Sequence, residues 1–172
     1  VSGNNSSTDE GNIVCKGCGG PGRQGSNIRA VNSSIIVSNT VDASDAVFDD
    51  VGSVNVTLQA TSWVSADLDV HNTVPDKMSG LQANNNSNVT INGGLLAQNS
   101  KIGVNIISSK VFVSSDVAAN GHTAANNIGI SLLDEAELVC GANVDASAAM
   151  APGLSTGITL ESGSTYHASG NT

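Results

Sequence analysis

The hydrophobic and polar positions of this chain follow one pattern that recurs along the sequence. After the pair Gly129-Ile130, apolar residues come at offsets of 2, 8, 10 and 14 positions from Ile130, namely at Leu132, Leu138, Cys140 and Val144. Apolar residues two positions apart are typical of β-strands, in which successive side chains point to opposite faces. The segment is therefore predicted to form a strand, a polar turn and a second strand, although its middle, "LLDEAEL", consists of good helix formers.

Five further copies of the pattern begin at positions 28, 48, 81, 104 and 158, and successive copies lie 20 to 33 residues apart. The copies from 28 and 104 place their later apolar residues one position early. The copy from Phe48 is weak, because Asp50 occupies one apolar position while Val56 and Leu58 fill two others. Short strands that recur at such a loose period indicate a solenoid.

Two or three short strands in each copy predict an all-β fold, a right-handed parallel β-helix of about six coils. The repeats are expected over residues 26–172, after a Gly- and Ser-rich segment over residues 1–25. A β-sandwich and a leucine-rich repeat are the alternatives. A sandwich usually holds large aromatic side chains between its sheets, whereas this chain has only two Phe, one Trp and one Tyr. A leucine-rich repeat is disfavoured because no helical segment recurs.

The charge of the chain excludes several classes of partner. The formal net charge is −9, with six Lys and Arg residues in total. No basic stripe for nucleic acid or for an anionic membrane surface is therefore expected. No apolar run reaches the roughly 18 to 20 residues that a membrane-spanning helix needs. The absence of an initiator Met and the uncharged final stretch "YHASGNT" predict a piece of a longer protein.

The repeat resembles the β-helical stems of bacteriophage tail fibres and tailspikes. The stretches that carry the resemblance are "SGLQANNNSNVTINGGLLAQNS", "IGVNIISSKVFVSSDVAANG" and "TGITLESGSTYHASGN". Pectin-lyase-like enzymes and bacterial surface adhesins share this coil pattern. The resemblance implies a homotrimer, located in the virion tail or otherwise outside the cell. It also implies contacts with other tail proteins and with bacterial surface polysaccharide or another cell-surface receptor.

The function that this resemblance implies is structural and adhesive: a tail-fibre segment that presents or contributes to host-surface polysaccharide binding. Two alternatives stay open. One is a polysaccharide-degrading tailspike or lyase, and the other is a secreted β-helical adhesin or filament subunit. A fold by itself does not decide between them.

The segment over residues 59–79 exceeds the corresponding part of other copies and is expected to project as a loop, where functional residues tend to gather. It holds Trp63 and His71 as candidate sugar-binding residues. Asp67 and Asp69 lie two positions apart on a strand-like stretch, about 7 Å along the backbone. That spacing suits a pair of glycosidase carboxyl groups. A solvated acidic face, with Trp63 in a contact between subunits, is the alternative and is preferred.

Cys15 and Cys18 form the motif C-x-x-C-x-G-x-G in "CKGCGGPG", which resembles one unit of the zinc-binding repeats of DnaJ-type chaperones. A structural zinc site needs four ligands, so the motif supplies half of one. A disulfide, thiols shared between subunits, and a Gly-rich loop with two reduced thiols are the alternatives, and the last is preferred. Cys140 falls at an apolar repeat position and is expected in the core. No other cofactor is expected.

Overall fold

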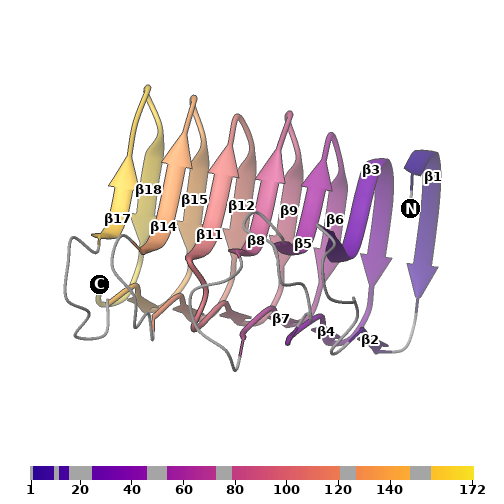
Figure 1. Ribbon diagram of the computed structural model, residues 1–172, viewed down its shortest axis with the longest axis horizontal. Helices are drawn as coiled ribbons and strands as arrows, with labels where there is room; N and C mark the ends of the chain where they lie inside the picture. Colours follow the sequence, from indigo (N-terminus) through magenta and orange to yellow (C-terminus); the bar gives the residue numbers. More distant parts are fainter. Residues whose placement is uncertain are drawn as a thin grey trace.

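The computed structural model describes residues 2–9, 12–15, 25–45, 54–72, 79–120, 127–147 and 156–172. Every regular element in these ranges is a β-strand, and none of them contains a helix that is long and apolar enough to cross a membrane. Each strand pair is parallel. The strands stack side by side along the long axis, with β1 at one end and β17 and β18 at the other (Figure 1).

The strands form three faces of a parallel β-solenoid. The first face consists of β3 (Ser26–Val37), β5 (Val54–Gln59), β8 (Ser79–Asn84), β11 (Ile102–Ile107), β14 (Ile128–Leu133) and β17 (Thr156–Leu160). The second face consists of β1 (Ser2–Asp9), the end of β3, β6 (Ser62–Ser65), β9 (Asn88–Ile91), β12 (Lys110–Val113), β15 (Glu137–Cys140) and β18 (Thr165–Ala168). The third face consists of β2 (Ile13–Val14), β4 (Val41–Asp42), β7 (Leu68–Asp69), β10 (Leu95–Leu96), β13 (Val117–Ala118) and β16 (Val144–Asp145).

Four successive coils contain one strand from each face, beginning at β5, β8, β11 and β14. The prediction of an all-β, coiled, parallel architecture is thereby confirmed. β1 and β2 pair with β3 and β4, so the stack already includes strands before the expected boundary at residue 26.

The core is a set of columns in which equivalent residues of successive coils lie above one another. One column on the first face contains Ile28, Val56, Leu81, Val104, Ile130 and Ile158. The buried members are Val, Ile, Leu and Ala with few exceptions, as the composition predicts. Cys140 is a buried free cysteine that lies next to Val113 on the second face, which confirms its predicted place in the core.

One predicted copy begins at the wrong residue. Val56 pairs with Ile28 and with Leu81, so Val56 and not Phe48 occupies the first column. Phe48 lies outside the described residues. The error arose because two apolar residues that lie two positions apart, such as Val56 and Leu58, occur on every face of the solenoid. This spacing alone does not show to which face a strand belongs.

The corrected register also overturns the loop expected over residues 59–79. Residues 62–65 and 68–69 of this segment form β6 and β7, which are regular strands of the second and third faces. The described part of the segment is therefore an ordinary piece of one coil.

The turns that join the first face to the second line one edge of the solenoid, at the top of Figure 1, which we call the turn edge. Each turn contains one or two residues with positive φ. Asn32, Ala60 and Ser108 are single, whereas residues 85–86, 134–135 and 162–163 come in pairs. The copies from 28 and 104 have single-residue turns, and this explains why their later apolar positions come one residue early.

A column of hydroxyl groups lies just inside the turn edge. The backbone N–H of Thr61 donates to Ser87 Oγ at 3.1 Å, and that of Ser87 donates to Ser109 Oγ at 3.0 Å. In the last two coils, Ala136 N–H donates to Ser164 Oγ at 3.2 Å. Each serine hydroxyl also donates to a carbonyl of its own turn, as Ser87 does to Asn84 O at 2.8 Å. The column thus joins successive coils through groups that are buried at Thr61, Ser87 and Ser109 and partly exposed at Ser164.

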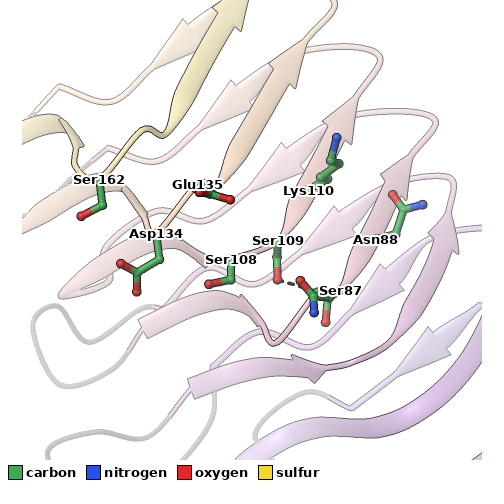
Figure 2. A pocket seen from close by; sticks show the side chains of 9 residues that line it. Ser87, Asn88, Ser108, Ser109, Lys110, Asp134, Glu135 and Ser162 are labelled. Carbon is green, nitrogen blue, oxygen red and sulfur yellow. Dashed lines mark hydrogen bonds between the residues drawn. The ribbon is translucent and has the colours of Figure 1, made fainter.

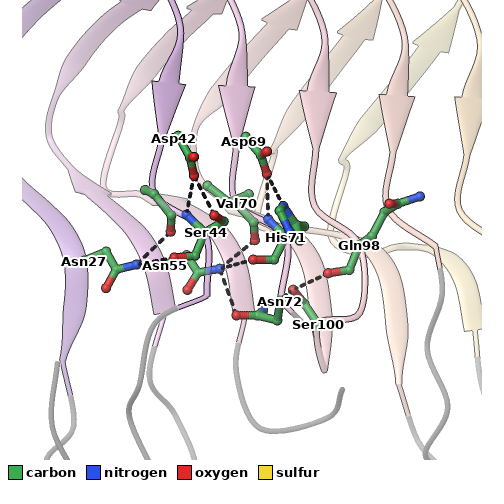
Figure 3. Close-up of polar contacts among 11 residues, drawn as sticks. Asn27, Asp42, Ser44, Asn55, Asp69, Val70, His71, Asn72, Gln98 and Ser100 are labelled. Atoms are coloured by element: carbon green, nitrogen blue, oxygen red, sulfur yellow. Dashed lines mark hydrogen bonds and ion pairs between the residues drawn. The ribbon is translucent and has the colours of Figure 1, made fainter. Parts of the chain in front are cut away.

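The corner between the third and first faces is filled in two ways. In the N-terminal coils it holds buried asparagines: Asn55 Nδ2 donates to Val70 O at 2.6 Å and to Asn72 Oδ1 at 3.1 Å (Figure 3). From β8 onward the same position is glycine. A Cβ on Gly103 would lie 2.7 Å from Gly129 O and 2.9 Å from Ala119 Cβ, so the two faces meet too closely there for any side chain.

The hydroxyl column predicts opposite effects for two substitutions. Ser87→Ala should lower the free energy of unfolding by about 1–3 kcal/mol, because it leaves the buried Thr61 N–H without its acceptor. Ala136→Ser should raise it by about 0.5–1.5 kcal/mol, because Ser109 N–H has no acceptor among the described residues and a hydroxyl at 136 would supply one. Denaturant unfolding of both variants measures the two shifts. A loss of stability in Ala136→Ser would contradict this account of the column.

Candidate functional site

The two carboxylates predicted from the sequence, Asp67 and Asp69, lie on the outer side of the third face. They belong to a group that we call the acidic row: Asp42, Asp67, Asp69, Asp116 and Asp145. Asp67, Asp69 and Asp116 line a shallow depression of about 350 Å³ together with Leu96 and Ala118. The structure therefore brings Asp67 and Asp69 to the same face, as their spacing predicts.

Two members of the acidic row hold the next coil in place. Asp67 Oδ1 accepts a hydrogen bond from Gly94 N–H at 2.7 Å, and Asp116 Oδ1 accepts one from Asn143 N–H at 2.9 Å. An amide does the same work elsewhere, since Asn143 Oδ1 accepts from Asn171 N–H at 3.0 Å. A role that asparagine can fill does not require the acid–base chemistry of a carboxyl group.

The other members of the row cap the corner that follows the third face. Asp69 Oδ1 accepts from His71 N–H at 3.1 Å and lies 2.6 Å from His71 Nδ1 (Figure 3). Asp145 Oδ1 accepts in the same way from the N–H of Ser147 at 3.0 Å and from its hydroxyl at 2.7 Å. These bonds stabilise the carboxylate form, so the pKa of Asp145 lies below its ordinary value. His71 is thus bound to Asp69 within a repeated turn.

Trp63 is not on a projecting loop. It lies in β6 with only 1% of its surface exposed, stacked between Ile35 and Val89, and its Nε1–H donates to Ser65 Oγ at 3.1 Å. The indole is a core side chain that offers no face to a ligand. The interpretation of Trp63 as a sugar-binding residue or as a contact between subunits is wrong for this physical reason.

Cys15 is disulfide-bonded, which is not the reduced state preferred from the sequence. Cys18 lies outside the described residues. Within the part of the chain that the structure describes, no three His, Cys, Asp or Glu residues come together to hold a metal ion.

A second depression, which we call the turn-edge groove, lies across the turns of four coils and has a volume of about 600 Å³ (Figure 2). All the residues that line it are of polar types: Asn86, Ser87, Asn88, Ser108, Ser109, Lys110, Asp134, Glu135 and Ser162.

The groove results from unequal turn lengths. The turn at Ser108 has one residue with positive φ, whereas the turns on either side, at 85–86 and at 134–135, have two. The shorter turn lies between two longer ones, so Ser108 and Ser109 form a floor between polar walls.

Most side chains of the groove walls are not held in place by hydrogen bonds within the described part of the chain. Those of Asn86, Asn88, Ser108, Asp134 and Glu135 form no hydrogen bond with any other described residue. This distinguishes them from the acidic row, whose carboxylates are bound to the neighbouring backbone.

Lys110 is the one groove residue with an ion pair among those described. Its Nζ lies 2.9 Å from Glu137 Oε2, and the neighbouring carboxylate raises the pKa of Lys110. Both side chains are exposed to solvent, so the pair adds little to stability, but it neutralises the positive charge beside the groove.

The repeat pattern places Asp134 and Glu135 in the polar turn that it predicts between two strands, and it does not by itself reveal a groove there. The signal that would have found the groove is the change in offset between copies, from 8 to 7 and back to 8, because it marks a short turn between two longer ones.

The chain has no match among known proteins in the three comparisons made. No protein-family model matches it, and neither a curated protein nor a solved structure is similar to it at a significant level. The class that the structure defines is a parallel β-solenoid with a polar groove along one edge.

Substitutions at Asp67 separate a structural role from a catalytic one. Asp67→Ala should lower the free energy of unfolding by about 1 kcal/mol, because Gly94 N–H loses its acceptor, whereas Asp67→Asn should preserve stability. Glu161→Ala is the matched control, since Glu161 is an exposed acid with no side-chain hydrogen bond to a described residue. Thermal unfolding measures all three. Equal stability of Asp67→Ala and the control would refute the structural role.

Proposed function

We propose that this chain is a structural and adhesive segment of an extended fibre of the phage tail-fibre or tailspike kind, and that it binds bacterial surface polysaccharide. The observation that carries the proposal is the turn-edge groove, with its uncommitted polar side chains on a rigid stack of strands.

Polysaccharide recognition needs many hydrogen-bonding groups in fixed positions. Asn88 offers an amide, Ser108 a hydroxyl, and Asp134 a carboxylate, which together can donate to and accept from sugar hydroxyls. Because the strands of successive coils fix the backbone on which these groups stand, little backbone entropy is lost on binding.

The architecture also suits a stem. Each coil contacts only its neighbours, so the length of the solenoid grows with the number of coils while its cross-section stays constant. A stem of this kind works outside the cell, in a virion tail or on a surface, where it meets polysaccharide.

Binding to purified capsular polysaccharides and lipopolysaccharides, measured by calorimetry, tests the adhesive role. The chain should bind at least one of them. Asn88→Ala should weaken binding about tenfold, the effect of losing one or two hydrogen bonds. The double variant Asp134→Asn with Glu135→Gln should weaken it by a similar factor, because hydrogen bonds to a neutral amide are weaker than those to a carboxylate. Asp134 and Glu135 lie at positions with positive φ. The amide substitutions remove the two charges and keep side chains of the same length at these positions.

Asp67→Asn, on the third face, is the control and should bind as the wild-type chain does. Binding that depends on Asp67 and not on the groove residues would overturn the assignment of the site. Release of reducing ends from the polysaccharide would favour the alternative, a polysaccharide-degrading enzyme.

Assembly as a homotrimer is part of the proposal and rests on the resemblance to phage fibres. Light scattering of the chain in solution should give a mass three times that of the 17.2 kDa chain. A monomer, or a series of growing head-to-tail assemblies, would favour the bacterial adhesin or filament subunit instead.

A further inference from the structure

Phe112 lies on the outer surface of the solenoid beside the turn-edge groove. In β12, Lys110 and Phe112 point outward while Val111 and Val113 point into the core, because side chains alternate along a strand. Lys110 lines the groove, and two residues along a strand span about 7 Å. The aromatic ring and the polar groove are therefore within reach of one ligand.

The ring of Phe112 is unusually exposed for its type. It has 43% of its surface open to solvent, and it lies between Thr90 on β9 and Val139 on β15. These neighbours form a low platform on either side of the ring. Trp63 is buried and Tyr166 packs against the core, so Phe112 is the aromatic side chain that the outer side of the described second face offers to a ligand.

We infer that the turn-edge groove and Phe112 form one binding site for a neutral sugar chain, in which a sugar ring packs against Phe112 while its neighbours bind in the groove. The inference rests on the proposed function and names the ligand class of the same site. A pyranose ring has a face of C–H groups that can cover an aromatic ring, and its hydroxyls lie around the rim. Covering Phe112 removes apolar surface from water, which favours binding.

The charges of the site select against acidic sugars. Asp134 and Glu135 form one wall without a basic partner among the described residues, and Lys110 is already paired with Glu137. A uronate or phosphate group in the groove would meet like charges, which costs affinity. The net charge of −9 adds a repulsion at longer range that depends on the salt concentration.

The repeat of the solenoid also fits a chain-like ligand. Successive coils lie about 4.8 Å apart, similar to the length of one sugar unit in an extended chain. The groove presents Asn88, Ser108, Asp134 and Ser162 from four successive coils. A sugar chain that runs along the turn edge thus meets a new set of polar groups at each unit.

Affinity for two sets of soluble probes tests the inference. Neutral probes are fragments of dextran and galactan, and acidic probes are fragments of polygalacturonate and polysialic acid. A neutral probe should bind at least tenfold more tightly than any acidic one in low salt. Phe112→Ala should weaken that binding about tenfold, and Phe112→Trp should retain it.

Ile36→Ala is the matched control. Ile36 is also 43% exposed on the outer side of the second face, but three strands away from Phe112. Its loss should leave the affinity unchanged. Circular dichroism checks that each variant keeps the strand content of the wild-type chain.

Three results would overturn the inference. If Asn88→Ala weakens binding and Phe112→Ala does not, the proposed function stands but Phe112 is not part of the site. If an acidic probe binds best, the ligand class is wrong. If Phe112→Ala changes the mass of the assembly in solution and not the affinity, the ring is a contact between copies. Failure of every probe and of every surface polysaccharide would instead remove the proposed function.

Discussion

The register between stacked coils is the constraint on which the rest of this structure depends. In a parallel pair, a shift by one residue turns every inward side chain outward. Each coil must therefore present Val, Ile, Leu or Ala to the same columns, as Ile28, Val56 and Leu81 do. Additional residues are accommodated only between strands. Variation in this chain is consequently concentrated in turns and corners, and from β5 onward the strands of each face vary little in length.

The turn edge shows how this constraint produces a site. A turn with one positive-φ residue, at Ser108, and a turn with two, at 134–135, both return the chain to the correct inward column. Both turn lengths give the same inward columns in the core. They give different surfaces, because the longer turn extends further from the stack. The turn-edge groove therefore forms because two different turn lengths are compatible with the same core register.

The fold was predictable from the sequence because the columns leave a direct trace in it. Apolar pairs recur after an anchor of Gly or Asn, and the structure explains both anchors: Gly103 lies where two faces meet too closely for a side chain, and Asn55 bridges the same corner. The prediction failed around Val56, where the pattern was assigned to the wrong face. That single error turned β6 and β7 into a loop and made the buried Trp63 look like a surface residue.

The site was harder to predict, because the sequence does not reveal which polar side chains are already bound. Asp67 and Asp134 are both exposed aspartates in polar stretches. They differ in what the next coil offers: Asp67 faces Gly94 N–H, whereas at the turn of Asp134 the next residue, Glu135, donates its N–H to the backbone oxygen of Ser162. The spacing of Asp67 and Asp69 predicts that they share one face. It does not reveal that both carboxylates already accept hydrogen bonds within the chain.

The hydroxyl column explains this difference between the two edges. At the turn edge, Ser87 and Ser109 accept the buried N–H groups of the preceding coils, and the N–H of Glu135 donates to Ser162 O in the next coil. With the backbone bonded from the inside, the side chains at the tips of the turns are not needed to cap it. At the third face of the described coils, the buried amide of Asn55 donates to carbonyls and does not accept backbone N–H groups, so carboxylates and amides accept those N–H groups from the outside. Polar side chains without hydrogen bonds to the backbone are thus found where buried hydroxyl groups accept the backbone N–H groups. A ligand that binds these side chains breaks few hydrogen bonds within the protein.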